Sequence, residues 1–225
     1  MPTRARQAIP SRAILWDNDG VLVDTEGLYY RATQEVLASA GVELTEPMYL
    51  QLFLIEGRGA WHLAEEKGLP PSQVATMRDR RNQKYRELVE QESRPLPGVT
   101  EALGALQPHF RMAIVTSSLA DHFAAAHKAS GLLPFFEFVL TRECYVKSKP
   151  DPEPYLCAVE RLGLPREECL VIEDSERGLR AAKGAGLACW VIPHGLSQHG
   201  SFAVADRVFR SISDVARELL RLDTR

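Results

Sequence analysis

The segment WDNDGVLVDT, residues 16–25, places two carboxylates one residue apart directly after the apolar run Ala13–Trp16. This pattern predicts a strand that ends in an acidic loop. In an open α/β sheet, ligands bind at the carboxyl ends of the strands, so we expect Asp17 and Asp19 to lie in the crevice where a reaction takes place. Two carboxylates this close repel each other, and a cation is their natural partner. The same residue types also form ordinary turns, so the segment alone leaves both interpretations open.

The length and charge of the chain narrow the classes of partner. Its 225 residues are enough for one large α/β domain or for a core with an insertion. A net charge of -3 gives no general attraction to nucleic acid or to anionic membranes. We therefore expect a small-molecule partner, with no nucleic acid and no membrane involved, and a monomeric protein.

The cysteines and the N-terminal segment bear on cellular location. The cysteines lie far apart, without the spacing of a zinc site, at Cys144, Cys157, Cys169 and Cys189. We expect buried thiols in a reducing compartment. Residues 1–12 carry arginines but no apolar stretch of signal-peptide length, and no run approaches about 18 apolar residues. A soluble, cytoplasmic protein is predicted, and the brevity of the basic tail disfavours an organellar transit sequence.

Apolar runs of strand length alternate with segments of helix length. The runs are Ala13–Trp16, Met112–Thr116, Leu170–Glu173 and Cys189–Ile192, with a weaker one at Phe138–Leu140. The helical segments between them are 120–130, 152–162 and 176–185, each followed by a glycine that suits the left-handed end of a helix. This βα alternation predicts a parallel sheet, and right-handed crossovers make it a doubly wound, Rossmann-like α/β core.

Residues 26–93 break the alternation, because they contain no convincing strand. Helical patterns occupy 28–40, 47–55, 60–67 and 71–91. We expect a helical cap inserted after the first catalytic loop, with residues 1–25 and 94–225 forming the core and PLPG, residues 95–98, as the rigid return. Such a cap suggests a lid that excludes water and selects the substrate, although a purely structural subdomain is the alternative. The basic cluster RDRR, residues 78–81, is expected to form a solvent-exposed helix face.

Three later segments supply what the first acidic loop lacks. Residues 115–118, VTSS, end a strand with hydroxyl side chains. The backbone amides of these residues can hold phosphate oxygens at a helix N-terminus, although such residues are also ordinary N-caps. Residues 147–152, KSKPDP, place a lysine before a helix, where an exposed linker lysine is the alternative. Residues 172–175, IEDS, end another strand with two adjacent acids, which a buried strand rarely does without a cation or a cap.

Together and in this order, the four segments resemble the haloacid dehalogenase superfamily, specifically its phosphatase and phosphomutase branch with a helical cap. The resemblance covers residues 13–192 and rests on the patterns DxDGVLVDT, VTSS, KPDP and EDSxxGxxAA. The joint pattern is far more specific than any of its parts.

The resemblance implies a role for each matching residue. Asp17 matches the nucleophile that forms an aspartyl-phosphate. Asp19 matches the general acid/base that protonates the leaving oxygen and then activates water. Thr116 matches the hydroxyl that holds the transferring phosphoryl group, and Lys149, with Lys147 as a nearby competitor, matches the lysine that neutralises its charge.

The resemblance also implies a magnesium ion and a set of substrate contacts. Mg²⁺ would be held by Asp17, the Asp19 carbonyl and Asp174, with Glu173 binding directly or through water. The substrate contacts are assigned to Gly20, Gly57, Arg58, Ser117 and Ser118. Charge on the phosphoryl oxygens would thus meet a cation, a lysine and oriented donors, which is what phosphoryl transfer requires.

Two relatives and an inactive binding protein are disfavoured. A dehalogenase attacks carbon and needs no metal, so Asp19 and the pair Glu173 and Asp174 argue against it. A phosphonoacetaldehyde hydrolase needs a cap lysine for a Schiff base. Here the cap loop reads EGRG, residues 56–59, and Lys67 lies well past it. A non-catalytic binding protein is disfavoured because every expected catalytic position is filled.

The nearer alternative is a β-phosphoglucomutase. Those mutases place a histidine where this chain has Tyr29, and an arginine that grips the distal phosphate roughly where it has Ala60. Here Arg58 directly follows Gly57, as in the sugar-phosphate phosphatases that the chain resembles. We predict a Mg²⁺-dependent phosphomonoester hydrolase that acts on a small phosphorylated metabolite, a sugar phosphate, through an aspartyl-phosphate.

Overall fold

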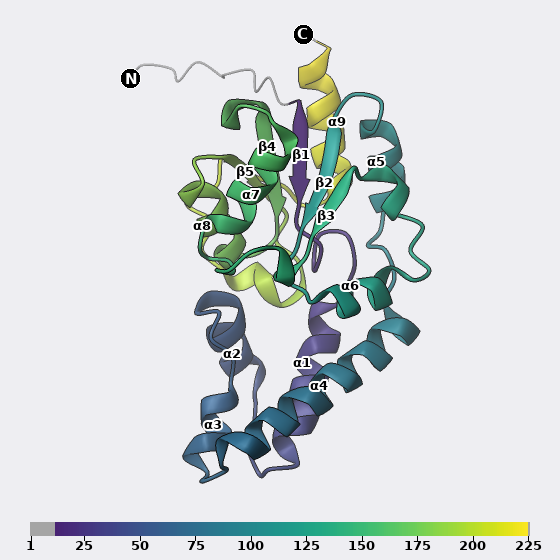
Figure 1. Cartoon of the computed structure of the whole chain (residues 1–225). Coiled ribbons are helices and arrows are strands. Elements are labelled where there is room, and N and C mark those ends of the chain that lie inside the picture. Colours follow the sequence, from purple (N-terminus) through teal and green to yellow (C-terminus); the bar gives the residue numbers. More distant parts are fainter. Residues whose placement is uncertain (1–11, 225) are drawn as a thin grey trace.

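The runs predicted as strands form one parallel sheet in the computed structural model (Figure 1). The structure describes residues 12–224, and within them the sheet has 6 strands in the order β3-β2-β1-β4-β5-β6. The strands are β1 (Ala13–Trp16), β2 (Arg111–Val115), β3 (Phe138–Leu140), β4 (Cys169–Glu173), β5 (Ala188–Val191) and β6 (Arg207–Val208). The predicted doubly wound α/β fold is confirmed, and the short edge strand β6 is an addition to it.

The helices follow the predicted segments closely. They are α1 (Glu26–Ala38), α2 (Glu46–Tyr49), α3 (Trp61–Glu66), α4 (Pro71–Glu92), α5 (Val99–Leu106), α6 (Ala120–His127), α7 (Glu153–Leu162), α8 (Glu176–Gly184) and α9 (Ile212–Asp223). A π-helix continues α2 over Leu50–Ile55, and 3₁₀ turns occupy Leu133–Phe135, Arg142–Cys144, Arg166–Glu168 and Gly195–His199. Helices α5 and α9 were not predicted. Residues 1–11, on which the transit question depends, lie outside the described residues.

Helices cover both faces of the sheet, and successive strand residues alternate between the two covered faces. In β1, Ile14 and Trp16 pack in the cluster that includes α5 and α9, whereas Ala13 and Leu15 pack in the cluster that includes α7 and α8. All four side chains are fully buried. This two-sided burial explains why the strands read as continuous apolar runs rather than as alternating ones. No helix in residues 12–224 has the length and apolar character needed to span a membrane.

The strand order reverses at β1, which pairs in parallel with β2 on one side and β4 on the other. On the two sides of β1, the connections to the next strand run in opposite directions. The loops that follow neighbouring strands therefore diverge and leave a crevice at the carboxyl edge of the sheet. The loops after β1, β2 and β4 therefore meet at one edge of the sheet. These loops carry three of the four segments that the sequence singled out.

Helices α1–α4 lie together beyond this edge (Figure 1). They share a hydrophobic cluster of their own, which includes Leu37, Tyr49 and Trp61. A smaller cluster joins α1 and α4 to α6 beside the sheet. The two chain segments that enter and leave this group run side by side, since the Leu96 amide donates to the Leu22 carbonyl at 2.9 Å.

Two expectations about side-chain burial need correction. Cys169 and Cys189 are buried as expected, but Cys157 is partly exposed, and Cys144 is exposed because it ends a 3₁₀ turn in a surface loop. The RDRR segment on α4 is not a solvated face throughout, because Arg81 is only 7% exposed. The Arg81 guanidinium lies 4.4 Å from the ring centre of Tyr29. Stacking on an aromatic ring lets an arginine be buried without a carboxylate partner.

A buried histidine supports the acidic loop. Asn18 is fully buried, and its side-chain oxygen accepts a hydrogen bond from Nε2 of His127 at 2.7 Å. Because that oxygen can only accept, Nε2 must carry the proton. The second ring nitrogen lies 2.9 Å from the Ser130 hydroxyl. Burial lowers the pKa of His127 from 6.5 to about 4, so the ring is neutral in the folded protein at neutral pH.

We predict that protonation of His127 destabilises the fold in acid. Between pH 6.5 and 4, His127 is protonated in the unfolded chain but stays neutral in the folded protein. The free energy of unfolding therefore falls as the pH drops through this range. The loss reaches on the order of 3 kcal/mol at the acid end of this window. Urea denaturation should give a stability difference between wild type and His127→Gln that is constant above neutrality and shrinks toward acid. The exposed His199→Gln serves as control, and a difference independent of pH would contradict the prediction.

Candidate active site

Three strand ends bring the predicted catalytic residues together. Asp17 follows β1, Thr116 follows β2, and Glu173 ends β4. In residues 12–224 all three side chains are buried, with Asp17 8% exposed and the other two fully covered. The parallel register explains the meeting, because Trp16 pairs with Ile114 on one side and with Ile172 on the other.

Lys149 ties all three strand ends together. Its Nζ donates to Asp17 Oδ1 at 2.6 Å, to Glu173 Oε1 at 2.8 Å and to the Val115 carbonyl at 2.8 Å. Burial alone would lower the pKa of Lys149, but the two carboxylates outweigh burial and raise it, so the ammonium stays charged. Lys147 is 70% exposed and lies 3.7 Å from Asp151, away from this cluster.

Three buried carboxylates lie close enough to share one cation. One oxygen from each of Asp17, Glu173 and Asp174 lies within 4.8 Å of the others. Burial, followed by repulsion from the other two carboxylates, raises the pKa of Asp174 well above its ordinary value. Burial and the charge of Glu173 likewise raise the pKa of Asp17. An all-oxygen donor set with excess negative charge fits a hard divalent cation such as Mg²⁺.

Gly20 allows Asp174 to approach the acidic loop. Its φ of +82° lies in the left-handed region, and a Cβ at this position would fall 2.4 Å from Asp174 Oδ2. Any side chain here would therefore be strained and would also displace that carboxylate. The structure thus places Gly20 beside the carboxylate cluster.

Asp19 is held by hydroxyl groups rather than by a cation. Its Oδ2 accepts hydrogen bonds from Thr116 Oγ1 at 3.0 Å and from Ser118 Oγ at 2.9 Å. Its Oδ1 accepts one from the hydroxyl of Thr25, which is fully buried. Asp19 therefore stands apart from the carboxylate cluster, and its environment differs from that of Asp17. Ser117 lies between Thr116 and Ser118 in the chain, and its hydroxyl is 3.2 Å from that of Ser148.

Both oxygens of Glu173 are engaged by donors of the protein. Besides Lys149, Oε1 accepts from the Tyr155 hydroxyl at 2.7 Å, while Oε2 accepts from Ser175 Oγ at 3.1 Å. Lys149 is the main cause that lowers the pKa of Glu173, against the opposing effect of burial. A Cβ on Gly178 would fall 1.8 Å from Oε1, which explains the glycine in the pattern EDSxxG. Glu173 thus fixes Lys149 whether or not it also contacts a metal.

A cavity of about 590 Å³ lies between the loops at the carboxyl edge of the sheet and the helical group. Its lining includes Asp19, Ser117 and Ser118 from the sheet side together with Gly57 and Arg58 from the loop before α3. Five arginines line it, at Arg58, Arg78, Arg81, Arg142 and Arg177. The sequence-predicted substrate contacts, apart from Gly20, therefore meet around one cavity. Arg58 is about half exposed and pairs with Glu56.

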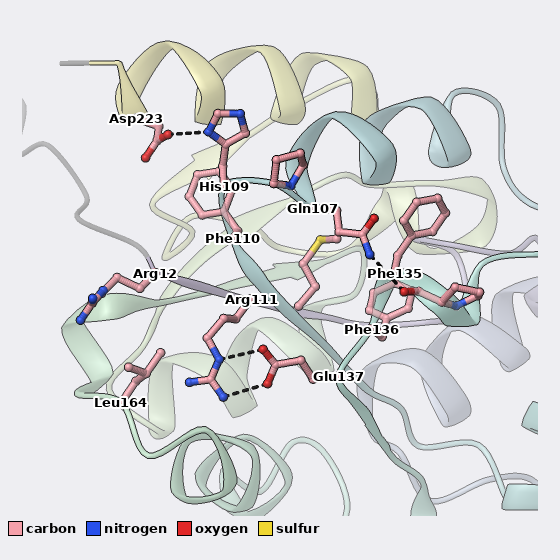
Figure 2. A pocket seen from close by; sticks show the side chains of 13 residues that line it. Arg12, Gln107, His109, Phe110, Arg111, Phe135, Phe136, Glu137, Leu164 and Asp223 are labelled. Atoms are coloured by element: carbon pink, nitrogen blue, oxygen red, sulfur yellow. Dashed lines mark hydrogen bonds and ion pairs between the residues drawn. The ribbon is translucent and has the colours of Figure 1, made fainter.

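A second cavity of about 730 Å³ lies at the opposite edge of the sheet, near the starts of β1 and β2 (Figure 2). Its charged residues pair with each other: Arg111 with Glu137 at 2.8 Å and His109 with Asp223 at 2.8 Å. None of the predicted catalytic residues among residues 12–224 lines it. The cavity at the carboxyl edge is the candidate active site.

Sequence reasoning missed several residues that complete this site. They are Thr25, Tyr155, Arg177 and the pair Asn18 and His127. Tyr155 belongs to the helix after KPDP, but a tyrosine within a helical pattern carries no signal of its function. The histidine lies 109 positions from its partner, and such a contact cannot be found without the fold.

The fold and site define a class of protein that the comparisons identify. The chain belongs to the haloacid dehalogenase-like hydrolase family, whose model matches residues 14–192. Protein CbbY of Cereibacter sphaeroides is 33% identical over 214 residues, covering 90% of this chain and 93% of that protein. The phosphorylated carbohydrates phosphatase of Thermotoga maritima is 30% identical over 176 residues, covering 78% of this chain and 82% of that protein.

Solved structures agree with this assignment. CbbY from Rhodobacter sphaeroides in complex with xylulose-(1,5)bisphosphate superimposes with a TM-score of 0.77 at 28% identity, covering 91% of this chain and 96% of that one. The predicted family, the predicted fold and the predicted class of enzyme, a haloacid dehalogenase-like phosphatase, are confirmed by these findings.

Proposed function

We propose that the protein is a Mg²⁺-dependent phosphomonoester hydrolase that acts on a small phosphorylated metabolite, a sugar phosphate, through a phosphorylated Asp17. The observation that carries this proposal is the buried cluster of Asp17, Lys149, Glu173 and Asp174 at the switch point of the sheet, next to an arginine-lined cavity. The relatives named for phosphorylated carbohydrates and for a xylulose bisphosphate complex support the substrate class.

The first step is attack of an Asp17 carboxylate oxygen on phosphorus. The bond from phosphorus to the leaving alkoxide breaks, and protonated Asp19 gives that oxygen a proton. The two aspartates differ in their surroundings. Burial and Glu173 raise the pKa of Asp17 against the opposing effect of the Lys149 ammonium, whereas Asp19 accepts hydrogen bonds from three hydroxyl groups.

The second step regenerates the enzyme. The Asp19 carboxylate accepts a proton from water, the water oxygen attacks phosphorus, and the bond to Asp17 breaks to release inorganic phosphate. Lys149, the Thr116 hydroxyl and the amide of Ser117 stabilise charge on the phosphoryl oxygens in both steps. When bound at Asp17, Asp174, the Asp19 carbonyl and Glu173, Mg²⁺ would neutralise charge and orient the phosphoryl group. Residues 26–93 act as a cap that covers the site and contributes Arg58.

Replacing the nucleophile should abolish turnover without unfolding the protein. We expect Asp17→Asn and Asp17→Ala to lose at least about 10³-fold in kcat, because neither side chain forms the phosphoenzyme. Phosphate release from p-nitrophenyl phosphate, with circular dichroism to verify folding, measures this. Asp79→Asn on α4 is the matched control. Substantial activity in either folded Asp17 variant would disprove the nucleophile assignment.

Turnover should require Mg²⁺, because three buried carboxylates and an anionic substrate cannot share one site without a further cation. We expect EDTA to abolish phosphate release and added Mg²⁺ to restore it. Asp174→Ala should remain inactive even with excess Mg²⁺ and should bind the ion more weakly in calorimetry. Undiminished turnover after complete chelation would refute this site model.

The mutase alternative makes a different prediction about the acceptor of the phosphoryl group. A mutase must protect the phosphoenzyme from water, and this chain has Tyr29 and Ala60 where mutases place the cap groups for that task. We expect inorganic phosphate to be released from sugar monophosphates without a bisphosphate activator. Conversion of β-glucose 1-phosphate into glucose 6-phosphate with negligible phosphate release would favour the mutase instead.

A further inference from the structure

Arg177 lines the active-site cavity from the sheet side and forms no ion pair in the described part of the chain. It is the second residue of α8, three positions after Asp174, and it lines the cavity together with Asp19 and Gly57. Its Nε is buried and has no hydrogen-bond partner in the described part of the chain. None of the ion pairs within residues 12–224 includes it. A guanidinium with an unsatisfied buried donor is costly unless a ligand completes it.

Three of the other four arginines of the cavity have polar or aromatic partners of their own. Arg58 pairs with Glu56, and Arg142 donates to the carbonyls of Tyr145 at 2.9 Å and Val146 at 3.1 Å. Arg81 stacks on aromatic rings and donates to Asn82 Oδ1 at 3.0 Å. The fourth, Arg78, is exposed and lies 5.7 Å from the ring centre of Trp61. Among the five cavity arginines in residues 12–224, Arg177 is the one with a buried donor that has no partner.

The position of Arg177 has no structural explanation within its own helix. A cation in the first turn of a helix opposes the helix dipole, which favours anions there. The preceding residue, Glu176, offers no compensation, because its carboxylate pairs with Arg180 and accepts from the Ser201 amide at 2.9 Å. A cation in the first turn of a helix that no contact compensates is typical of a functional position.

The surroundings hold Arg177 at the junction of the cap loop and the core. A Cβ on Gly57 would fall 3.3 Å from Arg177 Cδ, so the loop backbone packs directly on the side-chain stem. The carboxylate of Glu26 also lines the cavity and accepts the Tyr49 hydroxyl. Burial raises the pKa of Glu26 and the charge of Arg177 opposes that rise, but no ion pair joins the two side chains in residues 12–224. The guanidinium is thus positioned but left unpaired.

We propose that Arg177 binds a second anionic group of the substrate, so that the preferred substrates are phosphate esters with a further phosphate or carboxylate. This inference rests on the proposed function and specifies its substrate class. Arg177 lies three residues after the proposed metal ligand Asp174, and its stem packs beside Gly57, so the second anion would bind close to the reacting phosphoryl group. A planar guanidinium binds phosphate and carboxylate alike through paired hydrogen bonds.

Kinetics of Arg177→Met tests the proposal, because methionine retains much of the apolar stem against Gly57 but removes the charge. The substrates are xylulose 1,5-bisphosphate, phosphoglycolate, xylulose 5-phosphate and p-nitrophenyl phosphate. We expect KM to rise about 10- to 100-fold for at least one of the first two, while KM and kcat for p-nitrophenyl phosphate change less than about 2-fold. Arg217→Met on α9, which removes an equal charge from an exposed position outside the cavity, should behave as wild type, and Arg177→Lys should recover part of the loss.

The pattern of losses identifies the second anion. A loss confined to the bisphosphate assigns it as phosphate, and a loss confined to phosphoglycolate assigns it as carboxylate. An equal loss on all four substrates means a structural role and overturns the proposal, as does unchanged KM for both doubly anionic substrates.

Binding separates this inference from the proposed function. In the Asp17→Asn background, calorimetry should give at least about 10-fold weaker binding of xylulose 1,5-bisphosphate or phosphoglycolate when Arg177→Met is added. This result supports the anion site even if wild type releases no phosphate, which would refute only the hydrolase proposal. Equal affinity for both ligands with and without Arg177 overturns the inference.

Discussion

The ion pairs of Lys149 with Asp17 and Glu173 are the interaction on which the rest of the site depends. An ammonium buried to this degree is tolerable only when carboxylates surround it, and buried carboxylates are tolerable only with such a cation. The cluster therefore fixes the ends of β1 and β4 relative to the loop that carries Lys149. Lys149 satisfies two of the three carboxylates, and Asp174 is left without its own cation. The fold thus leaves an excess of negative charge at this site, which suits a hard cation.

The topology supplies the crevice that this cluster occupies. Because β1 pairs with both β2 and β4, the loops after these three strands converge at one edge, while helices cover both faces. Small residues make the convergence possible. Gly20 and Gly178 stand where a side chain would collide with Asp174 and Glu173, so the glycines of the motifs reflect close packing as much as backbone freedom.

The helices beyond this edge give the site its chemical character. The cavity between them and the sheet contains arginines from both sides, and aromatic rings of α1 and α3 hold Arg81. An enzyme for anionic substrates benefits from this arrangement, because positive groups in a partly desolvated cavity bind phosphate more strongly than they do in open water. In the proposal for Arg177, an arginine of the core binds an anionic group of the substrate in the same cavity.

The sequence by itself determined the five main strands and the helical segment inserted after the first loop, and it singled out the side chains that the structure gathers at one edge of the sheet. These features are local, since apolar runs and short motifs depend on neighbours in the chain. The structure decided that Lys149 rather than Lys147 enters the cluster, that Tyr155 and the Asn18 and His127 pair support it, and that Arg81 is buried. Each of these depends on groups brought together by strand order and by the packing of α1, α4 and α6. A charged residue in a polar helix has the same local pattern whether it faces water or an aromatic ring, and only tertiary packing distinguishes the two.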